Sequence, residues 1–144
     1  MTTPSTGLRV LIVDDEALAR SRLANLVTEC ADPRCSVAGE CANAQQARQW
    51  LSEYEADVVL LDIQMPGQSG TALAAELQRL AQPPTVVFVT AHAEHALAAF
   101  DLDAADYLTK PVKRERLAAA LQRAARRRPA RDGSAPAQGP VLVV

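Results

Sequence analysis

Carboxylate, hydroxyl and amine side chains stand at the ends of several short apolar runs in this sequence. Asp14 and Asp15 follow the first run, and Asp62 follows the third. Thr90 closes the fourth run, and Lys110 comes just after the fifth. If these runs are strands of one parallel sheet, their carboxyl ends share an edge, which is where open α/β sheets bind ligands. We therefore expect these five side chains to meet at a single site.

Three carboxylates gathered at such an edge would repel one another. At about 4 Å and an effective dielectric near 20, each like-charge pair costs about 4 kcal/mol. Protonation or a hard divalent cation relieves this repulsion, and carboxylate oxygens beside open water positions suit Mg²⁺. Asp14, Asp15 and Asp62 are therefore candidate ligands of a magnesium ion.

The same residues have the chemistry of a phosphoryl acceptor. A bound Mg²⁺ would let a phosphoryl group approach the Asp62 carboxylate and would stabilise charge on the transferring oxygens. Lys110 would supply a positive charge for a phosphate oxygen, and the Thr90 hydroxyl would supply a hydrogen bond. A nucleophilic carboxylate beside these groups predicts phosphoryl transfer to Asp62.

The elements that must hold these residues can be read from hydrophobic periodicity, because short apolar runs alternate with amphipathic segments. The expected strands are 8–13, 35–40, 57–61, 85–90 and 106–108. The expected helices are 17–30, 44–54, 71–80, 94–102 and 113–127. Glu16 is expected to cap the first helix. The alternation predicts right-handed crossovers and an α/β fold with a doubly wound, five-stranded parallel sheet.

Composition supports one globular domain in a chain of 144 residues, with 49% hydrophobic and 22% charged residues. A net charge of −2 gives no electrostatic case for coating nucleic acid. No apolar run is of membrane-spanning length, and the first residues, without a basic and an apolar region, do not predict a signal peptide. The three cysteines are odd in number and lack zinc-type spacing, so reduced thiols and a cytoplasmic location are expected.

Four segments resemble the signature segments of response-regulator receiver domains of the CheY-like superfamily, in the order and spacing of that family. They are LIVDDE at 11–16, VVLLDIQMPGQSG at 58–70, VTA at 89–91 and DYLTKP at 106–111. The resemblance covers about residues 7–128. It implies a flavodoxin-like (βα)5 fold with strand order 2-1-3-4-5.

The resemblance also implies a role for each matching residue. Asp62 would accept a phosphoryl group from a sensor histidine kinase. Asp15 and Asp62 would bind Mg²⁺ directly, Asp14 mostly through water, and Gln64 through its backbone carbonyl. Lys110 would contact the phosphoryl oxygens.

Other positions would carry the response to phosphorylation. Thr90 and Tyr107 would form a switch pair, in which the hydroxyl moves toward the phosphoryl group and the ring turns inward. Gln64 and His92 would tune autodephosphorylation. The Lys110–Pro111 peptide bond is expected to be cis, which is tolerated before proline.

The output is predicted from a narrower resemblance. Residues 96–111 resemble receivers of the LytR/AlgR class, whose next domain is a β-rich LytTR DNA-binding module. Residues 129–140 are rich in Pro, Ala, Gly and Ser and predict a linker, and 141–144 begin a β-prone run that fits a truncated output domain. We therefore expect a transcription regulator that binds DNA only through its output domain. It would dimerise through the face of helix 4, strand 5 and helix 5, and would not itself be an enzyme.

Three alternatives remain open. An Asp-nucleophile phosphohydrolase of the haloacid dehalogenase type would place a second aspartate where Gln64 stands. A flavodoxin-like FMN binder would need backbone amides after the first strand, where three acidic residues would repel the phosphate. A receiver that acts as a protein-interaction module without phosphorylation would leave an Asp62→Asn protein unchanged in vivo.

Overall fold

The computed structural model describes residues 7–91 and 104–127. In these ranges five parallel strands form one sheet in the order β2-β1-β3-β4-β5. The strands are β1 (Leu8–Val13), β2 (Cys35–Cys41), β3 (Val58–Asp62), β4 (Thr85–Thr90) and β5 (Asp106–Thr109). The helices are α1 (Ala17–Glu29), α2 (Ala44–Glu53), α3 (Gly70–Leu77) and α5 (Arg114–Arg127). The helix expected at 94–102 lies outside the described residues.

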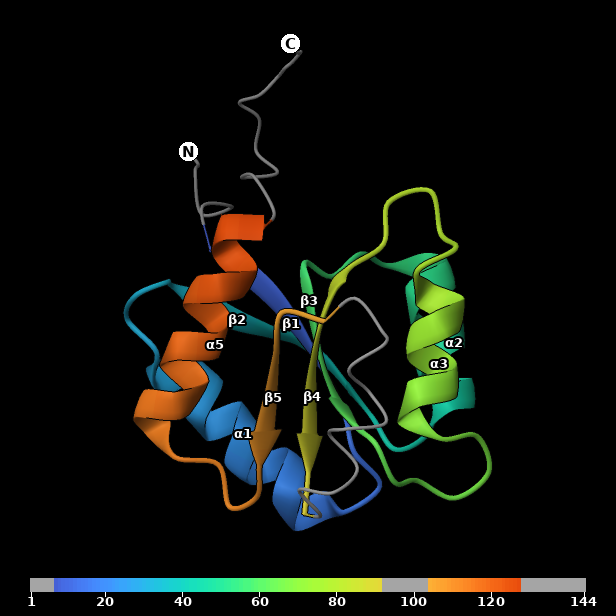
Figure 1. Cartoon of the computed structure of the whole chain (residues 1–144), viewed down its shortest axis with the longest axis horizontal. Coiled ribbons are helices and arrows are strands. Elements are labelled where there is room, and N and C mark those ends of the chain that lie inside the picture. The colour runs from blue at the N-terminus through green and yellow to red at the C-terminus, as the bar shows by residue number, and fades with distance from the viewer. Residues whose placement is uncertain (1–6, 92–103, 128–144) are drawn as a thin grey trace, which may run out of the picture.

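The helices cover both faces of the sheet. Helices α1 and α5 lie on one face, and α2 and α3 lie on the other (Figure 1). The predicted doubly wound α/β fold and its strand order are therefore confirmed.

The aliphatic strand sequences follow from burial on both faces, because successive side chains of a strand point to opposite sides. In β1, Val10 and Ile12 pack with α1 and α5, whereas Leu11 and Val13 pack with α2 and α3. All four side chains are fully buried. No polar residue could stand at these positions without losing its water contacts, so alternation of polar and apolar residues is absent here.

Helix α3 begins and ends earlier than predicted, at Gly70–Leu77 instead of 71–80. Its start is set by the Ser69 hydroxyl, which accepts a hydrogen bond from a first-turn amide at 3.2 Å. At its end the backbone tightens, and the Leu80 amide donates to the carbonyl three residues back at 3.1 Å. Local hydrogen bonds therefore decide bounds that hydrophobic periodicity alone did not predict.

Asp106 fastens helix α5 to strand β5. Its side chain is 7% exposed. It accepts hydrogen bonds from both terminal nitrogens of Arg116, at 3.0 and 3.1 Å, and from Arg123 at 2.8 Å. The Tyr107 amide donates to the same carboxylate at 2.8 Å. Burial acts to raise the pKa of Asp106, but the hydrogen bonds and the arginine charges hold this pKa below its usual value.

We expect Asp106→Asn to lower the free energy of unfolding at pH 7 by about 1–2 kcal/mol, because two arginines lose their ionised partner. A carboxyl with a lowered folded-state pKa contributes stability above its unfolded pKa, and this contribution is lost as pH falls through the folded pKa. The loss should therefore shrink toward pH 3. Urea unfolding at both pH values measures it. The exposed Glu53→Gln is the control, and an equal loss in both variants would contradict this role of Asp106.

Candidate functional site

The candidate site lies at the carboxyl edge of the sheet, where β1 and β3 end side by side. The strand order reverses between these two strands, since β2 lies on the other side of β1. Asp62 is the last residue of β3 and pairs in register with Val89 of β4. It was predicted to lie just beyond the strand. The sheet therefore fixes the Asp62 backbone.

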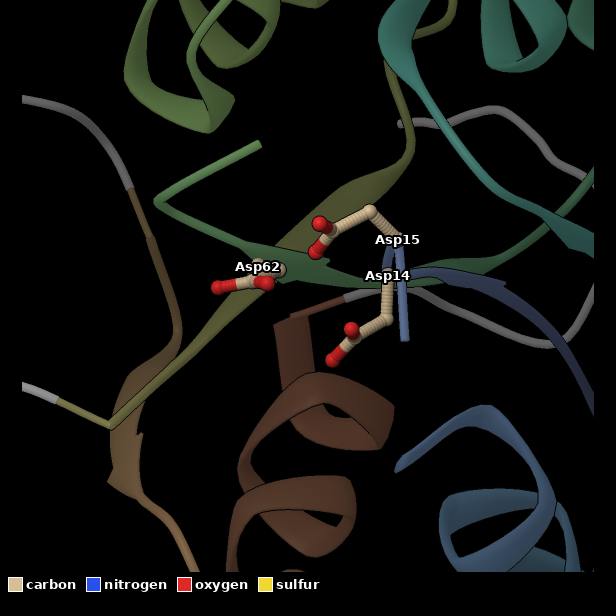
Figure 2. A group of neighbouring side chains, drawn as sticks. All are labelled: Asp14, Asp15 and Asp62. Carbon is tan, nitrogen blue, oxygen red and sulfur yellow. The ribbon is translucent and has the colours of Figure 1, made fainter. Parts of the chain in front are cut away.

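Three carboxylates gather at this edge. Figure 2 shows Asp14 and Asp15 at the end of β1 beside Asp62 of β3. One oxygen from each of the three lies within 4.8 Å of the others. Asp14 is fully buried and Asp62 is 5% exposed, whereas Asp15 is open to solvent.

Each of the two buried carboxylates is held by the backbone two residues further on. Asp14 Oδ1 accepts a hydrogen bond from the Glu16 amide at 2.9 Å, and Asp62 Oδ1 accepts one from the Gln64 amide at 3.2 Å. The second oxygens face the Lys110 ammonium, at 2.8 Å from Asp14 Oδ2 and 3.6 Å from Asp62 Oδ2. Lys110 thus places one positive charge beside both carboxylates.

Lys110 also contacts Glu16, whose Oε1 lies 3.4 Å from the ammonium. Burial acts to lower the pKa of Lys110, but its close ion pair with Asp14 and the charges of Asp62 and Glu16 raise this pKa overall. The prediction for Glu16 was wrong in part. It stands at the N-cap position of α1, yet its side chain makes no capping hydrogen bond.

The electrostatics of Asp62 are unusual. Desolvation, followed by the charge of Asp14, raises its pKa from 3.8 to about 6, although Lys110 and the Gln64 amide act in the opposite direction. One lysine does not neutralise the whole cluster. Desolvation and the neighbouring carboxylates therefore make the ionised form of Asp62 costly at neutral pH.

The space around Asp62 is shaped by the segment that follows it. A cavity of about 710 Å³ is bounded by this edge, and its lining includes Asp15, Asp62, Gln64 and Lys110. The Gly70 amide donates to the Ile63 carbonyl at 2.8 Å. A Cβ atom on Gly70 would lie 2.9 Å from the Asp62 carbonyl carbon, so only glycine fits without moving the Asp62 backbone.

The donor set fits a hard divalent cation. Carboxylate oxygens are the ligands that Mg²⁺ prefers, and the cavity leaves room for its water ligands. The buried Asp14 Oδ2 has no hydrogen bond of good geometry within the described part of the chain, although Lys110 lies close. A cation would offset the repulsion from Asp14, which adds to desolvation in raising the pKa of Asp62.

The sequence profile of the response regulator receiver domain matches residues 10–122. The chain belongs to the response regulator receiver family. It is 47% identical over 119 residues to the positive alginate biosynthesis regulatory protein of Pseudomonas aeruginosa, covering 83% of this chain and 48% of that protein. It is 40% identical over 116 residues to the sensory transduction protein LytT of Bacillus subtilis, covering 81% and 47%. The receiver chain thus spans about half the length of these curated relatives.

Solved receivers share the fold. The response regulatory domain of protein mrkE from Klebsiella pneumoniae superimposes with a TM-score of 0.75 at 32% identity, covering 83% of this chain and 97% of that one. The signal receiver domain of the putative response regulator NarL from Mycobacterium tuberculosis gives a TM-score of 0.75 at 29% identity, covering 85% and 98%. These matches agree with the strand order of the receiver described above.

The remaining predicted residues lie around this edge or outside the described ranges. Thr90 is buried at the end of β4. The half-buried Tyr107 ring stacks on Phe88, with centroids 5.7 Å apart. His92 lies outside the described residues. The Lys110–Pro111 peptide is cis, as predicted.

One residue near the site was not predicted from the sequence. Arg20 donates a hydrogen bond to the Asp14 carbonyl, and no local sequence pattern signals this contact.

Among the helices in 7–91 and 104–127, none is both long and apolar enough to span a bilayer.

We expect Asp62→Asn to raise the free energy of unfolding in magnesium-free buffer at pH 7.5, by about 1–3 kcal/mol. The pKa of Asp62 is raised to about 6, so its ionised form is less stable in the folded than in the unfolded chain. The gain should fall as pH drops below about 6, because folded Asp62 is then protonated.

Denaturant unfolding across pH 5 to 8 tests this expectation, with Glu53→Gln as the control for loss of an exposed carboxylate. A variant that is less stable than the wild type at pH 7.5 would mean that the ionised Asp62 is well accommodated without a cation.

Proposed function

We propose that this receiver accepts a phosphoryl group on Asp62 from a phosphohistidine of a sensor histidine kinase. The proposal rests on one observation above all. A nearly buried carboxylate at the mouth of a cavity lies beside two further carboxylates and within 3.6 Å of the Lys110 ammonium. This combination suits phosphoryl acceptance better than the other functions considered.

Mg²⁺ is the cation that we propose for the cluster. Asp15 and Asp62 would bind it directly, Asp14 mostly through water, and Gln64 through its backbone carbonyl. When bound, Mg²⁺ offsets the negative charge of the site and stabilises charge on the transferring oxygens. The hydrogen bonds that hold Asp14 Oδ1 and Asp62 Oδ1 keep these side chains oriented toward the cluster.

In the transfer, an Asp62 carboxylate oxygen attacks phosphorus as the bond from phosphorus to the imidazole nitrogen breaks. The electron pair of the broken bond stays on the imidazole, which takes up a proton, and the product is an acyl phosphate on Asp62. Lys110 gives up part of its contact with Asp14 and Asp62 to bind a phosphoryl oxygen. The Lys110 ammonium therefore exchanges a carboxylate partner for a phosphoryl oxygen without leaving the site.

The Thr90 hydroxyl is proposed to turn toward the phosphoryl group, and the Tyr107 ring to move inward as space opens. Phosphorylation adds about −1.5 to −2 charges, which biases the position of this hydroxyl. Tyr107 starts from its stack on Phe88. Its amide donates to Asp106 and its carbonyl accepts from Arg116, so the movement would be confined to the ring. Gln64 and His92 are proposed to tune the lifetime of the acyl phosphate.

A phosphohydrolase is the less suitable interpretation of the same site. That chemistry needs a general acid close to the nucleophile, and the exposed side chain two residues after Asp62 is Gln64. We therefore propose a signalling domain that is not an enzyme. A receiver that works without phosphorylation is also disfavoured, because each residue of the acceptor set is present.

The output and the partners form a further part of the proposal. Relatives named as an alginate regulator and as LytT favour a LytTR-type DNA-binding output that controls transcription. Residues 7–128 would form the receiver, and 129–144, which lie outside the described residues, would be a linker and the start of the output domain. The free cysteines suit the cytoplasm, where thiols stay reduced.

Incubation with acetyl phosphate and Mg²⁺ should add one phosphoryl group to the intact protein. We expect the adduct to be labile to hydroxylamine, dependent on Mg²⁺ and absent from Asp62→Asn. Intact-mass spectrometry measures it. Glu53→Gln, which removes an exposed carboxylate at the last residue of α2 and outside the acidic cluster, should be modified as the wild type is. An adduct that persists in Asp62→Asn would mean that another residue is the acceptor.

Phosphorylation should also shift the receiver from monomer toward dimer through the face formed by β5, α5 and the segment before β5. Tyr107 of the proposed switch pair belongs to β5, and the Asp106 contacts join β5 to α5 within this face. Sedimentation equilibrium with and without acetyl phosphate, with Asp62→Asn alongside, measures the change. Monomers at every concentration would contradict the dimer while leaving the acceptor assignment intact.

A further inference from the structure

Arg20 of helix α1 reaches back to the strand end that carries two of the clustered carboxylates. Its Nη1 donates a hydrogen bond of 2.6 Å to the Asp14 carbonyl oxygen. The Arg20 side chain is 22% exposed, so most of it is covered by the protein. A short hydrogen bond donated by a largely buried guanidinium is stronger than the same bond donated by a solvent-exposed guanidinium.

The guanidinium is held from a second side. Its Nε lies 3.8 Å from Glu40 Oε1 in strand β2. Arg20 therefore connects three elements: its own first turn of α1, the backbone at the end of β1 and the Glu40 side chain of β2. A planar group with several donors can make such a bridge, whereas a lysine has one charged nitrogen to share.

The bonded carbonyl belongs to the peptide unit that joins Asp14 to Asp15. Other contacts already fix Asp14, since its amide donates to the Cys41 carbonyl at 3.0 Å and its Oδ1 accepts from the Glu16 amide at 2.9 Å. The bond from Arg20 fixes the orientation of the following peptide plane. That plane sets the direction in which the exposed Asp15 side chain leaves the backbone.

We infer that Arg20 is a positioning residue for the proposed Mg²⁺ site, which it serves by holding the Asp14–Asp15 peptide in the orientation that aligns both carboxylates. The inference rests on the proposed function, because it concerns the same cation. Groups that orient metal ligands without touching the metal commonly change metal affinity by one or two orders of magnitude.

The positive charge of Arg20 and its positioning contact have opposite effects on the affinity for Mg²⁺. A positive group near the cluster repels a divalent cation, so loss of that charge alone would tighten Mg²⁺ binding. Loss of the positioning contact would weaken binding. The sign of the change therefore separates positioning from charge, and a purely charge-based role cannot imitate the expected result.

The test is calorimetric titration of the folded protein with MgCl₂, comparing wild type, Arg20→Met and Arg20→Lys. We expect Arg20→Met to bind Mg²⁺ on the order of tenfold more weakly. Arg20→Lys, which keeps the charge but on a single donor nitrogen, should recover part of the affinity. Arg79→Met removes an exposed charge just after α3, and it should bind within about twofold of the wild type.

Equal or tighter Mg²⁺ binding by Arg20→Met would overturn the inference. If Arg20→Met does not fold, as circular dichroism would reveal, the decision passes to Arg20→Lys: weaker binding supports positioning, and wild-type affinity overturns it. A wild-type protein that does not bind Mg²⁺ would instead count against the proposed function.

Discussion

Two carboxylates, Asp14 and Asp62, are nearly buried at one edge of the sheet, and the Lys110 ammonium lies 2.8 and 3.6 Å from them. Removing ionised groups from water costs several kcal/mol each unless charges and hydrogen bonds compensate. One lysine compensates in part, since the pKa of Asp62 still rises to about 6. The site keeps an excess of negative charge, and this excess is what makes it receptive to a cation.

A site with such a cost needs a framework that does not relax around it. The sheet supplies this framework because β1 and β3 are buried on both faces and joined in register, with fully buried aliphatic side chains up to the acidic residues. Burial of apolar area contributes about 25 cal/mol per Å². On the opposite flank, the Asp106 carboxylate and two arginines of α5 hold β5, which leads directly to Lys110. The free energy gained by packing in these layers offsets the cost of burying the carboxylates at the edge of the sheet.

Much of the fold was predictable because it depends on local pattern. Burial on both faces forces aliphatic runs, and the predicted strands 8–13 and 85–90 match β1 and β4. Bounds set by single hydrogen bonds were less predictable. The Ser69 cap places the start of α3 at Gly70, and the close approach of Gly70 to Asp62 depends on how two distant backbones pack.

The sequence by itself determined which chemical groups stand at the strand ends, because alternating strands and helices must bring parallel carboxyl ends to one edge. Only the tertiary structure decided which groups touch. Glu16 contacts Lys110, 94 positions away, instead of capping its helix, and Arg20 bonds the Asp14 carbonyl. The burial of Asp62 and the charges around it likewise set its pKa. Such contacts depend on distances through space, which side-chain type and spacing along the chain do not specify.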